Sequence, residues 1–394
     1  MEKESIIQYI NEFKKILSYV TSIGFFFGAG TSCAFGLPNI GDLTKECKKE
    51  LREYEKDFDN IEKTIRDLEG KQEISIEDLL NYIRQVEDLT KGRPDYNFIS
   101  ISGNRAKELD KKICETIFKV IKEKEEISNI SDLRRFVAWY DSTNRGLNKE
   151  IYTTNYDMLL EMALEANFIP YFDGFVGAYE PFFSPESIDF FSKEQNYIDK
   201  WIHLWKIHGS LNWMKKEKTS ISPERIARIS KIEKPINELM IYPSKEKYNL
   251  SRKEPFIAFF DRMKEYLKHG ELLYICSGYS FSDQHINEII FNALHQNKRL
   301  YVIVFCYEDV QVDEMSKYAT AYMNLCIIGP KKMIRNGIER EWEFDEEKES
   351  NNEYKLYWDD EKQICKLGDF KNLIEFLIEN SGRKSIIEEI INGK

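Results

Sequence analysis

The sequence lacks any long apolar run and has no surplus of positive charge. No stretch approaches the roughly 18 consecutive apolar residues of a membrane span, and the opening MEKESIIQYINEFKK carries acids where a signal peptide has a basic lead. Lysine and arginine number 57 against 68 acidic residues, a net charge of −11. A protein with a surplus of positive charge gains free energy by releasing the counterions of nucleic-acid phosphates, and this chain has no such surplus. Strong direct nucleic-acid binding is therefore not expected. The predicted location is the cytoplasm.

Metal-binding and disulfide patterns are also missing. The seven cysteines are an odd number, are scattered and include no C-x-x-C pair, which argues against a disulfide framework and against a structural zinc site. Four histidines share no ligand spacing with one another or with the cysteines, so no metal site is predicted; they are His203, His269, His285 and His295. The cysteines, Cys33 among them, are expected to be packing residues.

The length of 394 residues allows two to three domains of roughly 150 residues, or one domain with a large insertion. Apolar residues at 42% and charged residues at 32% are typical of a folded globular protein. An amphipathic helix is predicted over 5–20, because apolar residues recur there every three or four positions. A buried strand is predicted over 23–27. From about 43 to 148 the pattern is mostly helical and charged, which predicts a helical insertion.

The second half of the chain alternates short apolar runs with helical patterns. Helices are predicted at 222–232, 255–269 and 286–296, and the alternation predicts an α/β fold, a Rossmann-like parallel sheet with helices on both faces. The acidic stretch 339–361 is expected to form a two-stranded ribbon or a loop, and 370–394 a helical tail. Buried strands are predicted at 151–154, 204–207, 239–242, 272–276, 301–305 and 325–328.

Four short motifs carry candidate chemistry, and the first is G-A-G-T-S at 28–32, directly after a predicted strand. Glycines let a backbone approach a pyrophosphate closely, and N–H groups near a helix start, with the hydroxyls of Thr31 and Ser32, can bind its charge. The full G-x-G-x-x-G fingerprint is absent because position 33 is a cysteine. A tight turn without a ligand is an equal alternative for this motif taken alone.

The second motif is T-T-N-Y-D at 153–157, at the carboxyl end of another predicted strand. Open parallel sheets bind ligands at that edge, so the polar side chains of Asn155 and Asp157 are well placed for ligand binding. The alternative is an Asn/Asp turn that caps the following helix.

The third motif is His208-Gly209, again after an apolar run. A histidine at a strand end can act as a general base near neutral pH, and the glycine leaves room for a bound sugar ring. A single histidine considered in isolation is more often structural.

The fourth motif is S-G-Y-S-F-S-D at 277–283, between a predicted strand and a predicted helix. Gly278 and Ser280 can hold phosphate or ribose, and Asp283 can accept hydrogen bonds from ribose hydroxyls. A simple helix cap formed by Ser282 or Asp283 is compatible with this use.

The order of the four motifs resembles the sirtuin family. G-A-G-x-S with a following proline, then T-x-N-x-D, then H-G, then a strand ending in G-x-S before a helix is the sirtuin arrangement, and it spans 28–283 of this chain. Residues 43–148 show no resemblance to that family.

The resemblance implies a Rossmann-like sheet that binds NAD and cleaves its nicotinamide–ribose bond. It implies that His208 is the general base and that Asn155 and Asp157 orient the nicotinamide ribose and a water. Departure of nicotinamide leaves an oxocarbenium-like ribose, so such a site must hold the sugar, stabilise charge and deliver a nucleophile. The residues expected along NAD are Gly28, Ala29, Gly30, Thr31, Ser32, Pro38, Gly278, Tyr279, Ser280 and Asp283.

Three departures distinguish the chain from protein-deacylating sirtuins. Residues 214–238 contain no cysteine, so the paired C-x-x-C zinc module is missing and no zinc is expected. N-I-G-D at 39–42 replaces the usual D-F-R, and I-Y-P-S at 241–244 stands where a peptide-binding strand would be expected. Water is therefore the expected acceptor. The pattern is similar to sirtuin-like NAD hydrolases of bacterial anti-phage systems, and among these to subunits that work beside a HerA-type ATPase.

Two other functions remain open at this stage: an NAD-dependent protein deacylase or ADP-ribosyltransferase, and a non-catalytic nucleotide-sensing scaffold. The expected organisation is a sirtuin-like NAD-binding domain at 1–42 and 149–330, a helical insertion at 43–148, and an acidic segment with a helical tail at 331–394. An unrestrained NAD hydrolase would harm its own cell, so a homo-oligomer or a controlling partner protein is expected, with the insertion as contact or lid.

Overall fold

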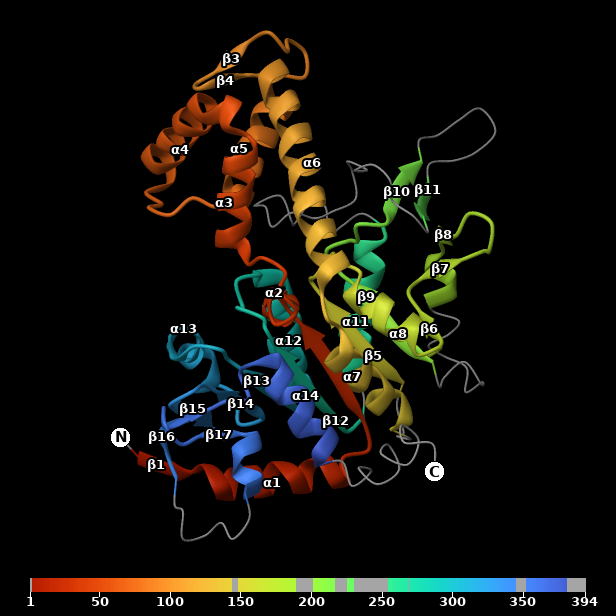
Figure 1. Ribbon diagram of the computed structural model, residues 1–394, viewed down its shortest axis with the longest axis vertical. Helices are drawn as coiled ribbons and strands as arrows, with labels where there is room; N and C mark the ends of the chain where they lie inside the picture. Colours follow the sequence, from red (N-terminus) through yellow and green to blue (C-terminus); the bar gives the residue numbers. More distant parts are fainter. Residues whose placement is uncertain are drawn as a thin grey trace.

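The computed structural model describes residues 2–143, 148–188, 201–216, 225–229, 254–268, 270–344 and 352–380. Within them, ten strands form one central sheet, helices cover both of its faces, and a group of further helices projects from one end (Figure 1). The fold is Rossmann-like, as the sequence predicts.

Four parallel strands at the centre of this sheet position the candidate motifs. They are β2 (Ile23–Phe27), β5 (Lys149–Thr153), β9 (Ile202–Lys206) and β12 (Leu272–Ser277). Almost all of their residues are buried, which is typical of parallel strands covered on both faces. The predicted strands at 23–27, 151–154, 204–207 and 272–276 are therefore confirmed.

The sheet continues on the far side of β12 through β13 (Leu300–Phe305) and β14 (Leu325–Ile328), both predicted and both parallel. An antiparallel hairpin of β15 (Lys332–Arg335) and β16 (Ile338–Glu343) follows, so the acidic stretch begins as a strand of the main sheet. β1 (Glu2–Ser5) pairs with β16, and this strand was not predicted. With β6 (Tyr171–Phe172) at the opposite edge, the order is β1-β16-β15-β14-β13-β12-β2-β5-β9-β6.

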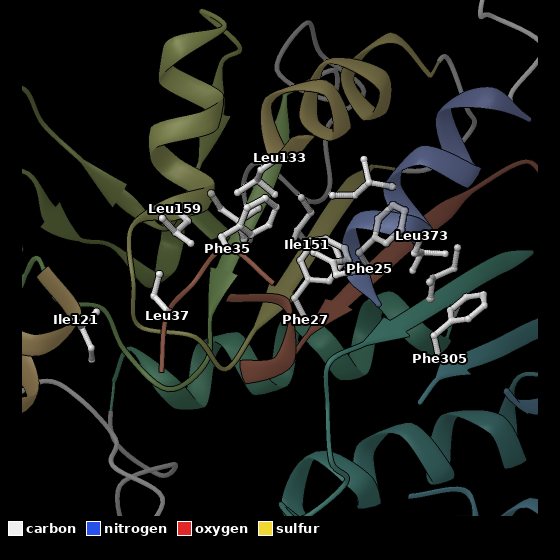
Figure 2. Close-up of a cluster of buried hydrophobic side chains, with 14 of the residues drawn as sticks. Phe25, Phe27, Phe35, Leu37, Ile121, Leu133, Ile151, Leu159, Phe305 and Leu373 are labelled. Carbon is white, nitrogen blue, oxygen red and sulfur yellow. The ribbon is translucent and has the colours of Figure 1, made fainter. Parts of the chain in front are cut away.

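Alternation along β2 divides the core between the two faces of the sheet. Phe25 and Phe27 belong to one hydrophobic cluster and Phe26 to the other, because successive side chains of a strand point to opposite faces. Figure 2 shows Phe25 and Phe27 near Ile151 of the neighbouring strand. The first cluster also continues into the helices between residues 40 and 127. The helices beside the sheet that contribute to it include α1 (Ile6–Tyr19), α7 (Ser131–Ser142), α8 (Leu159–Ala166) and α14 (Phe370–Glu379).

In the described part of the chain, the helices that cover the second face are α11 (Phe256–Lys268), α12 (Gln284–Gln296) and α13 (Asp309–Ala319). The first two lie where the sequence predicts helices. Asp283 is the N-cap of α12, and its side chain accepts hydrogen bonds from the first turn of the helix.

The charged region after β2 is helical, as predicted. Helices α3, α4, α5 and α6 pack on one another and project from the sheet (Figure 1), whereas α7 packs against α8 and α14. Interleaved apolar residues of this region, such as Ile61, Ile83 and Ile113, are fully buried. Its elements are α3 (Ile40–Glu50), η1 (Arg52–Tyr54), α4 (Glu55–Glu69), α5 (Ile76–Leu89), β3 (Asn97–Phe98), β4 (Ile101–Ser102) and α6 (Gly103–Ile127).

A small second sheet corrects one prediction. The helix expected over 222–232 is wrong, since Arg225–Arg228 forms β11. Antiparallel pairing with β10 (Trp213–Lys216) overrides the local helical pattern there. The sheet order is β10-β11-β8-β7, with β8 at Phe182–Phe183 and β7 at Phe175–Val176.

Two sequence predictions fall outside the described residues: the strand at 239–242 and the end of the helical tail beyond 380. Between β16 and α14, the described residues contain three short elements. They are η4 (Asn352–Leu356), β17 (Trp358–Asp359) and β18 (Ile364–Cys365).

A buried ion pair holds α11 against the centre of the sheet. Glu150 of β5 is fully buried and pairs with Arg262 of α11. Its carboxylate also accepts hydrogen bonds from the Tyr152 hydroxyl and from Trp205 Nε1, the latter at 2.9 Å. Burial alone would raise the pKa of Glu150, but the charge of Arg262, together with the adjacent His203 side chain, holds it at about 2.

We expect Arg262→Met to cost about 3 to 5 kcal/mol of unfolding free energy at pH 7, since it leaves the Glu150 carboxylate buried without its cation. In the wild type the Glu150 carboxylate has a lower pKa folded than its unfolded value of about 4.3. Its contribution is therefore present above that unfolded value and is lost as the pH falls towards 2. Chemical denaturation at pH 7 and pH 3 measures both effects.

Lys264→Met is the matched control on the same helix, because Lys264 forms an exposed pair with Asp261. Such pairs contribute about 1 kcal/mol or less. Equal losses in the two variants would contradict the assigned role of the buried pair.

Candidate active site

The carboxyl ends of the four central strands are aligned in register. Ser277 of β12 pairs with Phe27 of β2, Phe27 with Thr153 of β5, and Thr153 with Lys206 of β9. The segments that follow these strands are the four motifs of the sequence. The fold therefore brings all four to one edge of the sheet, where open parallel sheets bind ligands.

The loops after β2 and β12 are in direct backbone contact. Gly28 N donates to Ser277 O at 3.0 Å, and Gly30 N donates to Gly278 O at 2.9 Å. A Cβ at Gly28 would lie 2.4 Å from Gly278 O, and one at Gly278 would lie 2.4 Å from the backbone N of Thr31. Gly278 also has a φ of +65°, which favours glycine. The close contact between the loops therefore explains why positions 28 and 278 require glycine.

Asn155 joins the second motif to the first. Its Nδ2 faces three acceptors: Gly28 O at 3.0 Å, Thr31 Oγ1 at 3.0 Å and Ser32 Oγ at 2.8 Å. A carbonyl such as Gly28 O can only accept, and the Thr31 hydroxyl donates its own proton to that same carbonyl. The orientation of the carboxamide is therefore determined, with nitrogen towards the glycine turn and Oδ1 as the remaining acceptor.

Asp157 joins the same network. The Ser32 hydroxyl donates to Asp157 Oδ2 at 2.6 Å, while Oδ1 accepts from Leu159 N at 3.2 Å at the start of α8. The carboxylate therefore both caps the helix, as in the turn considered from the sequence, and fixes the Ser32 hydroxyl. α2 (Ala29–Cys33), which carries Ser32, is thereby tied to the loop after β5.

His208 lies two residues beyond the end of β9 and is 6% exposed. Its Nε2 is 3.1 Å from Asp283 Oδ2. Asp283 Oδ1 accepts from the backbone N of His285 at 3.0 Å and caps α12. The third and fourth motifs are thus joined across the edge by one histidine–carboxylate contact.

Lys206 is a residue of the site that sequence reasoning missed. It is 3% exposed, and its ammonium group contacts the backbone carbonyl of Asp157, Glu161 Oε1 at 2.9 Å and Ser210 Oγ at 2.9 Å. Burial raises the pKa of Glu161, and the charge of Lys206 opposes that shift. A lysine inside the apolar run L-W-K-I-H was the available signal, because lysine is rarely buried without a partner.

The helical insertion also contacts the site. Glu125 of α6 is 1% exposed, and its Oε1 accepts from Met158 N at 2.6 Å, one residue beyond Asp157. Burial raises the pKa of Glu125, with Asp157 adding to the shift. Ser128, directly after α6, donates to Phe35 O at 2.9 Å. No local pattern in the sequence indicates these contacts, which link two strand-end loops to the insertion.

Three expected ligand residues lie at the periphery of this network. Tyr279 is buried and packs on Phe26 with ring centroids 4.7 Å apart, so its ring belongs to the core. Ser280 is exposed and hydrogen-bonds the Ser282 hydroxyl at 3.1 Å. Pro38 is half-buried and precedes Asn39, the cap of α3.

Cys33 is half-buried at the end of α2. Burial raises the pKa of its thiol, and the charge of Asp157 adds to this. The thiol is therefore protonated near neutral pH, consistent with the packing role expected from the sequence. The other six cysteines are buried, and none of the seven forms a disulfide.

A cavity of about 470 Å³ lies between α11 and α12, and none of its lining residues belongs to the four motifs. Its walls include Phe260, Ile289 and His285, and His285 lies two residues after Asp283 in the chain.

Among the described residues, no group of three or more histidine, cysteine or acidic side chains has a geometry that could hold a metal ion. No helix within the described ranges is long and apolar enough to cross a membrane.

Comparison with known families places a SIR2-like domain in this chain. Residues 149–328 match the model of that family, from the first residue of β5 to the last of β14. The match includes the motifs with Asn155, His208 and Gly278 and fits an enzyme that uses NAD. No curated protein matches the chain. The glycine turn at 28–32 precedes the matched region, and its place beside the other motifs comes from the fold.

We expect Gly278→Ala to destabilise the protein by about 1 to 3 kcal/mol more than Gly70→Ala, since its added methyl group overpacks the contact with α2. Gly70 is a matched control because its φ of +68° is almost equal and a Cβ there meets nothing within 4 Å. The free energy of unfolding of both variants gives the difference. Equal losses would show that backbone conformation, and not loop contact, requires the glycine.

Proposed function

We propose that this protein is an NAD glycohydrolase, which converts NAD and water to nicotinamide, ADP-ribose and a proton. The single observation that carries the proposal is the hydrogen-bonded assembly at the carboxyl edge. Asn155, Ser32 and Asp157 form one network there, and His208 and Asp283 form the other. The SIR2-like match supplies the reason to consider NAD.

The proposed reaction begins with cleavage of the bond between the nicotinamide nitrogen and the ribose C1′. The bonding electron pair moves to the nitrogen, which neutralises the pyridinium, and positive charge develops on the sugar. Water then attacks C1′ and loses a proton to His208, which later releases it to solvent. The chain's role is to hold the ribose, stabilise its charge and deliver the water.

Asn155 is proposed to orient the water or the ribose. Its amide nitrogen faces the glycine turn, so Oδ1 is the group able to accept a hydrogen bond from a ligand hydroxyl or from the water. An acceptor that is held in place before the reaction needs no reorganisation when the water attacks. Thr31 and Ser32 then act by fixing this carboxamide, and the backbone beside Ala29 and Gly30 remains the proposed path of the diphosphate.

Water is the proposed acceptor because the features that bind an acylated peptide are absent from the sequence. Residues 214–238 have no cysteine, and 241–244 read I-Y-P-S in place of a peptide-binding strand. A deacylase or ADP-ribosyltransferase would require a peptide or protein acceptor, which makes the two classes separable by product analysis.

We expect purified wild-type protein to release nicotinamide and ADP-ribose from NAD, and chromatography measures both products. His208→Ala and Asn155→Ala should each lower the rate on the order of 10² to 10⁴-fold, because each removes the base or the positioning amide. His295→Ala, at an exposed position of α12, is the control and should retain full activity. A fully active His208→Ala variant would refute the assignment, and release dependent on an acyl-lysine peptide would favour the deacylase.

We further propose that this activity depletes NAD in the cytoplasm during bacterial anti-phage defence, as a homo-oligomer or with a HerA-type ATPase. The resemblance to such NAD hydrolases supports this, as does the need to restrain an enzyme that consumes NAD. The helical insertion is the proposed contact, since Glu125 and Ser128 connect α6 to the site loops.

Light scattering combined with the NAD assay tests the proposed restraint. We expect an assembly larger than one chain, or a rate that changes when a HerA-type ATPase is added. A monomer with constant full activity under both conditions would contradict the proposal.

A further inference from the structure

We propose that Asp283 is a positioning residue that fixes the tautomer and ring orientation of His208. The inference rests on the proposed function, in which His208 is the base, and it assigns Asp283 a role different from binding the ribose. It is carried by the contact between His208 Nε2 and Asp283 Oδ2 at 3.1 Å and by the way in which the rest of the loop holds the carboxylate.

The carboxylate has a fixed position because its other oxygen is engaged by α12. Asp283 Oδ1 accepts from His285 N at 3.0 Å and from Ile286 N at 3.4 Å. The backbone carbonyl of Asp283 lies 3.2 Å from the Tyr279 hydroxyl. With an exposed fraction of 5%, the Asp283 side chain has little room for another rotamer. Oδ2 is therefore presented towards His208 by the helix cap itself.

The loop before the cap is fastened by a second set of bonds. Asn287 Nδ2 donates to Phe281 O at 2.7 Å, and Asn287 Oδ1 accepts from the Tyr279 hydroxyl at 3.0 Å. Phe281 has a φ of +55°, a conformation that a phenylalanine keeps only where its surroundings hold it. The geometry of the segment between β12 and α12 is thus determined within the protein.

This arrangement selects one form of the imidazole. Two backbone N–H groups that donate to Asp283 favour its ionised form, and an ionised carboxylate can only accept hydrogen bonds. The neutral ring of His208 must then carry its proton on Nε2, and in the proposed reaction Nδ1 is the nitrogen that takes the proton of the attacking water. The imidazolium formed in that step is stabilised by the adjacent carboxylate.

The variant Asp283→Ser tests this role. Serine keeps a side-chain oxygen to cap α12 but is too short to reach His208. We expect kcat for NAD hydrolysis to fall on the order of 10²-fold with KM nearly unchanged, since the variant alters the base and not the binding of NAD. A raised KM with unchanged kcat would overturn the inference in favour of a ribose-binding role.

Asp369→Ser is the matched control. Asp369 also caps a helix, α14, through Asn372 N at 3.1 Å, and it lies outside the candidate site. Both variants should lose similar amounts of thermal stability, because both exchange one helix cap for another. Only Asp283→Ser should lose activity; equal losses of activity in both variants would overturn the inference.

Nuclear magnetic resonance of the histidine rings tests the positioning role of Asp283 without an activity assay. The chain has five histidines, so ¹⁵N labelling of histidine gives few ring signals, and that of His208 is assigned by its absence from His208→Gln. We expect its neutral ring to be the single Nε2–H tautomer in the wild type and a mixture of tautomers in Asp283→Ser. If the wild type does not hydrolyse NAD, the proposed function fails while this result still supports the positioning role. A tautomer mixture in the wild type overturns that role.

Discussion

Close contact between the backbones after β2 and β12 is the constraint on which the candidate site depends. Gly28, Gly30 and Gly278 allow the two loops to approach until hydrogen bonds form between them. That approach presents Gly28 O, Thr31 and Ser32 to the Asn155 carboxamide. The same loop leads from Gly278 to Asp283 and so to His208. A larger side chain at any of the three glycines would separate the loops and disturb both hydrogen-bond networks.

Buried charges connect this edge to the rest of the molecule. The Lys206 ammonium group donates a hydrogen bond to the backbone carbonyl of Asp157. Glu125, in the helical insertion, accepts a hydrogen bond from the backbone N–H of the next residue, Met158. Both groups are almost completely buried and are retained because each has specific hydrogen-bonding partners. The loop that carries Asn155 is thus supported from two elements that are distant in sequence. A change in the position of α6 would be transmitted to it directly, which gives the insertion a physical route to the chemistry.

Much of the fold could be predicted because its signals are local. β2 and β12 are short apolar runs between polar turns, and α11 and α12 show regular apolar spacing, so their positions follow from the sequence. The error at Arg225–Arg228 has the opposite cause: its pattern suits a helix, but pairing with β10 makes it a strand. β1 was missed for a similar reason, since E-K-E-S has no apolar character and becomes a strand only beside β16.

The sequence by itself determined the four motifs, their order and the strand ends that carry them, because each depends on residues that are adjacent in the chain. Only the tertiary structure decided which partners these residues have. Ser32 meets Asp157 across 125 positions, and His208 meets Asp283 across 75. Such pairings depend on strand order and register, which bring Phe27, Thr153 and Lys206 into one row. No local pattern encodes that alignment, because it arises from the packing of the whole sheet.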